Sequence, residues 1–249
     1  MSYLVFDIET AALPFDSLEE SQQEYLLRNC RTDEEREKEK DLMSLNPLTS
    51  QVVAIGMLHA RSLDSDPSGC IYTAGAGVTE EERLPDGTKW CEMPEADLLR
   101  KWWEILSHGR QNNGGYHLIS FNGRGFDAPF LMLRSAMLRI RPSRNLVDGT
   151  KFNYRMHTDL QDELAFYSYG KSGPTRRFNF DFYCKAFGIP SPKGEGITGA
   201  DVPEFFRAGR TREIAEYCMR DVHATWELFK VWKEYLCEES GGGWEGGRG

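Results

Sequence analysis

Acidic side chains near the N-terminus are the first residues whose types and spacing indicate chemistry. Asp7 and Glu9 stand two positions apart in the run SYLVFDIET, which is otherwise mostly apolar and predicts a strand. Side chains at i and i+2 of a strand point to the same face, so the two carboxylates project together. Burying ionised carboxylates is costly unless they are paired. The pair therefore either sits at a solvated strand end or holds a cation, and Mg²⁺ and Mn²⁺ prefer such oxygen ligands.

Two further acidic residues lie in segments where ordinary structure also explains them. Asp127 ends the segment SFNGRGFD and precedes a predicted helix, where it would serve as an N-cap. Asp221 follows Tyr217 by four positions on a predicted helix, so both residues share one helix face. A buried hydrogen bond between them would account for that pair. Taken singly, none of these residues indicates an enzyme.

In chain order, however, the patterns Asp-x-Glu, Asn-x3-Phe-Asp and Tyr-x3-Asp resemble the exonuclease motifs of the DEDD, or DnaQ-like, superfamily. The tyrosine (DEDDy) variant is the one matched, because Glu216 stands where the histidine variant has its histidine. The sequence is most similar to the proofreading exonuclease domain of family B DNA polymerases and to stand-alone bacterial proteins like that domain. The resemblance covers residues 3–237, and the segments HTDL (157–160) and KAFGIPSPKG (185–194) also look like the family's intervening segments.

This resemblance implies a ribonuclease H-like fold, with helices on both faces of a mixed α/β sheet, and a 3′-5′ exonuclease that uses two divalent ions, Mg²⁺ or Mn²⁺. The positions that hold the metals in the family correspond to Asp7, Glu9, Asp127 and Asp221. Tyr217 corresponds to a catalytic position that orients the attacking water, since a phenol with a pKa of about 10 is a poor base at neutral pH. The positions that bind the 3′-terminal nucleotide correspond to Ile8, Thr10, Asn122 and Phe126.

Composition and charge limit the class of protein further. A chain of 249 residues with 40% hydrophobic residues predicts a folded domain, and no stretch resembles a membrane span or a secretory signal. The net charge of −9 argues against a protein that coats nucleic acid through general positive charge, but an acidic site can recruit phosphates through cations. The six cysteines are scattered without a C-x-x-C pair, which favours reduced thiols and a cytoplasmic location.

The charge is also distributed unevenly along the chain. Residues 14–41 are acidic and rich in helix formers, whereas residues 134–155 hold six Lys or Arg residues against one Asp. Each segment is explained by a solvated face, and the second is also compatible with a rim that faces phosphates.

Periodicity and turn residues predict the elements that must position these side chains. The predicted strands are 3–9, 51–60, 70–75 and 115–123, with a strand or helix start near 156–160. The predicted helices are 95–109, stopped by Gly109, then 127–140, 178–189 and 211–236. Residues 1–237 are expected to form one exonuclease domain with a charged helical insertion at about 14–50, and residues 238–249 a flexible glycine-rich tail.

Three functions stay open at this point. The first is hydrolysis of single-stranded DNA from its 3′ end. The second is the same chemistry on RNA, because the sugar preference depends on the shape of the site around the 3′ end. The third is a catalytically silent nucleic-acid-binding module on the same fold, which would be expected to have lost carboxylates.

Overall fold

The computed structural model describes residues 2–113, 115–150, 154–191 and 197–237, so the predicted tail lies outside the described residues. The strands are β1 (Ser2–Ala12), β2 (Ser50–Ala60), β3 (Ser68–Ala74), β4 (Glu82–Arg83), β5 (Lys89–Met93), β6 (Tyr116–Ser120) and β7 (His157–Asp159). They form one seven-stranded sheet in the order β4-β5-β3-β2-β1-β6-β7. Strand β1 is antiparallel to β2 and parallel to β6, so the strand that carries Asp7 and Glu9 lies inside the sheet.

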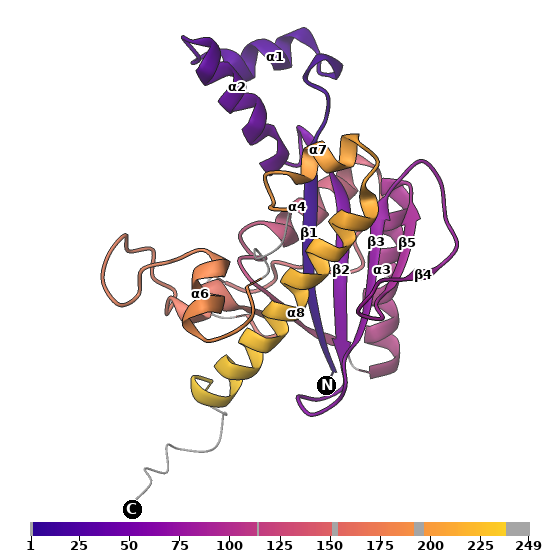
Figure 1. Ribbon diagram of the computed structural model, residues 1–249, viewed down its shortest axis with the longest axis vertical. Coiled ribbons are helices and arrows are strands. Elements are labelled where there is room, and N and C mark those ends of the chain that lie inside the picture. Colours follow the sequence, from indigo (N-terminus) through magenta and orange to yellow (C-terminus); the bar gives the residue numbers. More distant parts are fainter. Residues whose placement is uncertain (1, 114, 151–153, 192–196, 238–249) are drawn as a thin grey trace, which may run out of the picture.

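Helices cover both faces of this sheet. They are α1 (Glu20–Leu27), α2 (Asp33–Leu42), α3 (Glu95–Asn113), α4 (Asp127–Met137), α5 (Leu160–Leu164), α6 (Phe180–Ala186), α7 (Val202–Arg207) and α8 (Thr211–Tyr235), with the 3-10 turns η1 (Phe15–Ser17) and η2 (Met43–Leu45). Helix α8 crosses one face of the sheet, and α3 lies behind the other (Figure 1). The predicted mixed α/β sheet with helices on both faces is therefore confirmed.

The alternation of side chains along β1 explains how both faces are used. Tyr3 packs against Trp226 of α8 with ring centroids 5.8 Å apart, whereas Phe6 packs against Trp102 of α3 at 5.1 Å. Asp7 and Glu9 share the parity of Tyr3 and therefore project toward the α8 side. Apolar side chains on both faces hold β1 in the core, which keeps the two carboxylates in place.

A β-bulge between Glu9 and Thr10 marks the end of β1 that carries the acidic pair. Beside it, the Glu95 carboxylate accepts a hydrogen bond from the backbone N–H of Val52 at 2.9 Å and binds the Arg134 guanidinium at 2.7 and 2.9 Å. Bulges re-aim side chains and are frequent next to active sites. Because Arg134 is buried in this ion pair, it is not part of a solvated basic face.

Several predicted helix termini differ from the structure: the helix predicted at 127–140 ends at Met137, and the one predicted at 178–189 is Phe180–Ala186. Two further differences have a clear physical reason. Helix α3 extends past Gly109 to Asn113. The glycine at this position leaves room for the ring of Tyr116, since an added Cβ would lie 2.1 Å from a Tyr116 ring carbon. Asp127 is not the N-cap of α4; that position belongs to Phe126, and Asp127 is the first helical residue. Its carboxylate is consequently available for a contact outside its own helix.

The charged segment at 14–50 contains the two short helices α1 and α2. Helices α1 and α2 project away from the sheet at the end where β1 stops (Figure 1). Thr32 caps α2 in a reciprocal pair with Glu35, while neither helix contains a buried residue. The Thr10 hydroxyl ties the insertion to the sheet by donating a hydrogen bond to the carbonyl oxygen of Ser44 at 2.7 Å.

Within the described part of the chain, every helix is too short or too polar to cross a membrane.

Candidate active site

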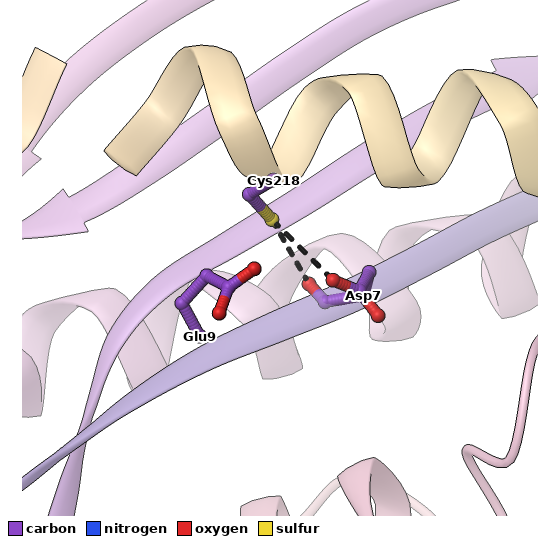
Figure 2. Close-up of side chains that lie close together, drawn as sticks. All are labelled: Asp7, Glu9 and Cys218. Atoms are coloured by element: carbon purple, nitrogen blue, oxygen red, sulfur yellow. Dashed lines mark hydrogen bonds between the residues drawn. The ribbon is translucent and has the colours of Figure 1, made fainter. Parts of the chain in front are cut away.

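The acidic pair of β1 lies beneath α8 on the sheet surface. Glu9 is 8% exposed, and Asp7 is partly buried. Figure 2 shows the two carboxylates beside the thiol of Cys218 from α8, whose sulfur is 3.7 Å from the Asp7 backbone oxygen and 3.9 Å from its carboxylate. One ligand atom from each of the three side chains lies within 4.8 Å of the others. The solvated strand end, one of the two initial explanations, does not describe this pair.

Helix α8 approaches the sheet closely because β2 carries a glycine opposite Asp7. Asp7 pairs with Gly56 across the β1–β2 ladder. A Cβ atom at position 56 would lie 2.8 Å from the Cys218 sulfur and 3.0 Å from a methyl carbon of Val222. Glycine at this position therefore sets the distance between α8 and the acidic pair.

Asp127 joins the acidic pair through a contact with the backbone of β1. Its carboxylate oxygen Oδ1 accepts a hydrogen bond from the backbone N–H of Ile8 at 3.0 Å, and Ile8 stands between the two acidic residues. Asp127 is 4% exposed. A residue 119 positions away is thereby fixed against the D-x-E segment.

Helix α8 adds Tyr217 and Asp221 to this cluster. The two residues interact directly, because a hydrogen bond with Asp221 contributes to the raised pKa of the Tyr217 phenol. Burial is the largest cause of that shift, followed by the charges of Asp221, Glu9 and Asp7. At neutral pH the phenol keeps its proton, as expected for a group that orients water instead of abstracting its proton.

The carboxylates raise one another's pKa values. The pKa of Asp7 lies well above its ordinary value, first because of burial and then because of the charges of Asp127, Glu9 and Asp221. Burial likewise raises the pKa of Glu9, with contributions from Asp221 and Asp127. For Asp127, burial raises the pKa to about 7, although the N–H of Ile8 opposes the shift. The structure therefore gathers the four predicted acidic residues into one region of unbalanced negative charge, which a cation would relieve.

A turn between β6 and α4 presents the predicted residues Asn122 and Phe126. Asn122 adopts a positive φ of 62°, and the backbone N–H groups of Gly125 and Phe126 both donate to its carbonyl oxygen. Gly123 is required because a Cβ there would meet the Ser120 hydroxyl oxygen at 2.3 Å. Asp127 follows directly and begins α4.

The predicted substrate-binding residues differ in the solvent exposure of their side chains. Asn122 and Phe126 are partly exposed, and the ring of Phe126 packs on Phe130 with centroids 5.5 Å apart. Ile8 is 5% exposed and contributes mainly its backbone N–H, which Asp127 occupies. Thr10 is 8% exposed, and its hydroxyl proton binds Ser44. Their roles toward a nucleotide stay predictions.

Two neighbours of the site were not predicted as site residues. Cys218 follows Tyr217 and contacts Asp7, but a lone cysteine in an apolar helix gives no signal in sequence. Asp159, at the end of β7, accepts hydrogen bonds from the N–H groups of Asn122 at 2.8 Å and Arg124 at 2.9 Å. Asp159 lies in the segment HTDL, which resembles an intervening segment of the family and predicts no role for Asp159 itself.

Similarity to known structures supports the class of fold. The chain is similar to the family B DNA polymerase of the hyperthermophilic archaeon Pyrobaculum calidifontis, with a TM-score of 0.55 and 15% identity over 94% of this chain. The match covers 24% of the polymerase chain, so this chain spans about a quarter of its length. The fold is the ribonuclease H-like fold of the exonuclease domain of such polymerases.

Sequence similarity places the chain within a family. Residues 50–236 match the family described as a predicted 3′-5′ exonuclease related to the exonuclease domain of PolB, and the chain belongs to this family. Asp7 and Glu9 precede the matched segment. The chain is also 26% identical over 186 residues to the uncharacterized protein MJ0365 of Methanocaldococcus jannaschii, a match that covers 65% of this chain and 91% of MJ0365. The family implies a nucleic-acid substrate.

Proposed function

We propose that the protein is a DEDDy-type 3′-5′ exonuclease that hydrolyses single-stranded DNA with two divalent metal ions. The observation that carries this proposal is that Asp7 and Glu9 lie together on β1, Asp127 binds the backbone of Ile8 between them, and the charge of Asp221 on α8 acts on both carboxylates. Such an arrangement raises the free energy of the folded protein unless cations occupy it. The catalytically silent alternative is disfavoured, because no carboxylate of the set is missing.

The donor set fits Mg²⁺ or Mn²⁺. Hard divalent ions take carboxylate oxygens and keep positions open for water and substrate phosphate. Two such ions, when bound, activate the attacking water and stabilise the leaving oxygen of the phosphodiester. The four carboxylates hold them, and the backbone bond between Asp127 and Ile8 fixes one carboxylate relative to the others.

In this proposal the remaining residues orient the substrate. The Tyr217 hydroxyl directs the attacking water, since a phenol is a poor general base at neutral pH. Asn122 and Phe126, on the turn before α4, line the 3′-terminal nucleotide. The backbone of Ile8 and Thr10 borders the terminal sugar.

Single-stranded DNA is proposed as the substrate because the family is described as related to the exonuclease domain of PolB, and the similar solved structure is a family B DNA polymerase. A single-domain arrangement of residues 1–237 and a cytoplasmic location complete the proposal. None of the six cysteines forms a disulfide, in agreement with reduced thiols.

The deciding experiment is digestion of matched 5′-labelled DNA and RNA single strands in the presence of Mg²⁺ or Mn²⁺. We expect a ladder of shortened labelled DNA, a slower reaction on RNA, and no ladder with Asp221→Ala. Release of the 5′-labelled nucleotide as the first product would contradict the proposed polarity. Faster digestion of RNA than of DNA would assign the enzyme to exoribonucleases instead.

A further inference from the structure

The segment around α6 carries an unusual surface that the four-carboxylate site does not use. Of the described aromatic side chains that are well exposed, most lie here: Phe166, Tyr169, Phe182 and Phe187, at 67%, 60%, 52% and 39%. The same stretch, residues 165–187, holds four Lys or Arg residues and one Asp, in a chain whose net charge is −9. Exposed rings and cations are therefore concentrated in this stretch.

The rings and cations of this segment are already arranged against one another. Phe178 and Phe182 stack with centroids 4.2 Å apart and planes at 10°. The Arg176 guanidinium lies over the Phe178 ring at 4.8 Å, and Arg177 lies over Tyr169 at 3.8 Å. Arg177 is also paired with Asp162, which holds this part of the chain in place. We call Tyr169, Arg176, Arg177, Phe178, Phe182 and Lys185 the aromatic–basic surface.

This surface adjoins the candidate active site through the inner face of α6. Tyr183 packs on Phe121, the residue before Asn122, with ring centroids 5.7 Å apart. Cys184 on the same helix is fully buried, so the inner face of α6 packs into the core beside the turn that carries Asn122. Phe182 is on the outer side of the same helix. Because a helix is about 10 Å across, the outer side of α6 stands about one helix width from Phe121 and the turn that carries Asn122.

We propose that the aromatic–basic surface binds the single strand upstream of its 3′ end. Proteins that bind single strands combine cations along the backbone with aromatic rings on which bases stack. Bases within a duplex are stacked on each other and are not available to the rings, so the surface selects single-stranded substrate. This inference rests on the proposed nuclease function and extends it to a substrate several nucleotides long.

The test compares Phe182→Ala and Arg176→Ala with Tyr25→Ala as matched control. Tyr25 is 62% exposed and lies under Arg28 at 3.6 Å, but it belongs to the acidic insertion. Fluorescence anisotropy measures binding of a labelled 12-nucleotide single strand in EDTA, so that no hydrolysis is needed. Removing one stacking ring is expected to weaken binding about tenfold. Arg176→Ala is expected to reduce the salt dependence of binding, and Tyr25→Ala to leave the affinity within twofold of wild type.

Kinetics in Mg²⁺ supply the second measurement. With Phe182→Ala, KM for the 12-nucleotide strand is expected to rise about tenfold, and KM for a dinucleotide to rise much less, because a dinucleotide does not span the surface. Equal affinity of wild type and Phe182→Ala would overturn the inference, as would preferential loss of binding with Tyr25→Ala. If wild type bound the strand through this surface but hydrolysed nothing, the proposed nuclease function would be wrong, whereas the inference that this surface binds single strands would be retained. If both variants bound DNA normally, the surface would instead be assigned to a protein partner.

Discussion

At the scale of single residues, the acidic cluster opposes folding when no cation is present. Burial and three neighbouring negative charges raise the pKa of Asp7, so its ionised form is unfavourable in the folded protein. Asp7→Asn removes one of these charges while keeping the shape of the side chain. We therefore expect the metal-free variant to unfold at a higher temperature than wild type, with a gain of about 1–2 kcal/mol.

The nuclease activity of Asp7→Asn is expected to fall at least about 100-fold. This loss exceeds the usual effect of removing a group that only hydrogen-bonds to a metal ligand. Thermal unfolding in EDTA and a nuclease assay measure the two effects. Asp16→Asn, an exposed acid in η1, removes the same charge and is expected to change neither. Lower stability of metal-free Asp7→Asn would count against a repulsive cluster.

Tyr217 is expected to act through its hydroxyl alone. In Tyr217→Phe the ring still packs in the core, so Mg²⁺ affinity by calorimetry should remain within threefold of wild type. Activity should fall about 10–100-fold, because one positioned group for the attacking water is lost. Tyr183→Phe on α6 is the control, since the Tyr183 hydroxyl contacts only the carbonyl of Arg176 among the described residues, at 3.5 Å. Full activity of Tyr217→Phe would remove Tyr217 from the catalytic set.

At the scale of elements, the position of α8 over β1 and β2 depends on Gly56. In Gly56→Ala the new methyl group meets the Cys218 sulfur at 2.8 Å, and Val222 restricts relief on the other side at 3.0 Å. Overpacking of this kind costs about 1–3 kcal/mol. Moving α8 also separates Asp221 from Asp7 and Glu9, so we expect Mg²⁺ affinity to fall about tenfold.

Gly77→Ala provides the control, because a Cβ at that position has no atom within 4 Å. Calorimetric Mg²⁺ titration and thermal unfolding of both variants are the measurements. Unchanged metal affinity in Gly56→Ala would show that α8 does not set the geometry of the cluster.

Elements with a clear period could be predicted from sequence, and contacts between elements could not. The hydrophobic residues of β1 and α8 recur with periods of two and 3.6 residues, which predicts a strand and a helix. The order of the three family-like motifs identified the acidic residues within these two elements. No local pattern shows that Asp127 binds the backbone of Ile8, because that contact joins residues 119 positions apart. The sequence predicts a helix stop at Gly109, because it does not reveal the ring of Tyr116 that packs against this glycine.

At the scale of the whole molecule, stability should depend on pH with opposite signs from two groups of residues. Burial lowers the pKa of His117 to about 4 and that of His157 to about 3, below the ordinary value of 6.5. The unfolded chain therefore binds more protons, and stability falls as pH decreases through 6.5 toward 4. The Asp127 carboxyl, with a pKa of about 7 against an ordinary 3.8, acts in the opposite direction: its contribution falls as pH rises from about 4 to 7.

The effect of Mg²⁺ separates these two groups, because a bound cation replaces protons only in the carboxylate cluster. We expect the stabilisation by Mg²⁺ to increase with pH between 5 and 7, by about 1.4 kcal/mol per pH unit for each proton displaced. Unfolding temperatures with Mg²⁺ and with EDTA at several pH values give this difference directly. Stabilisation that is independent of pH would mean that Mg²⁺ binds elsewhere than at the raised carboxyls.

The proposed function requires that the four carboxylates gather divalent ions for phosphodiester hydrolysis. The most direct measurement is the rate of mononucleotide release from a single-stranded DNA 3′ end as Mg²⁺ is titrated into EDTA-treated wild-type and Asp7→Asn protein. We expect no release without metal, saturable activation of wild type, and at most about 1% of that rate in Asp7→Asn. Equal rates in EDTA and in Mg²⁺, or an Asp7→Asn variant as active as wild type, would contradict the proposed function.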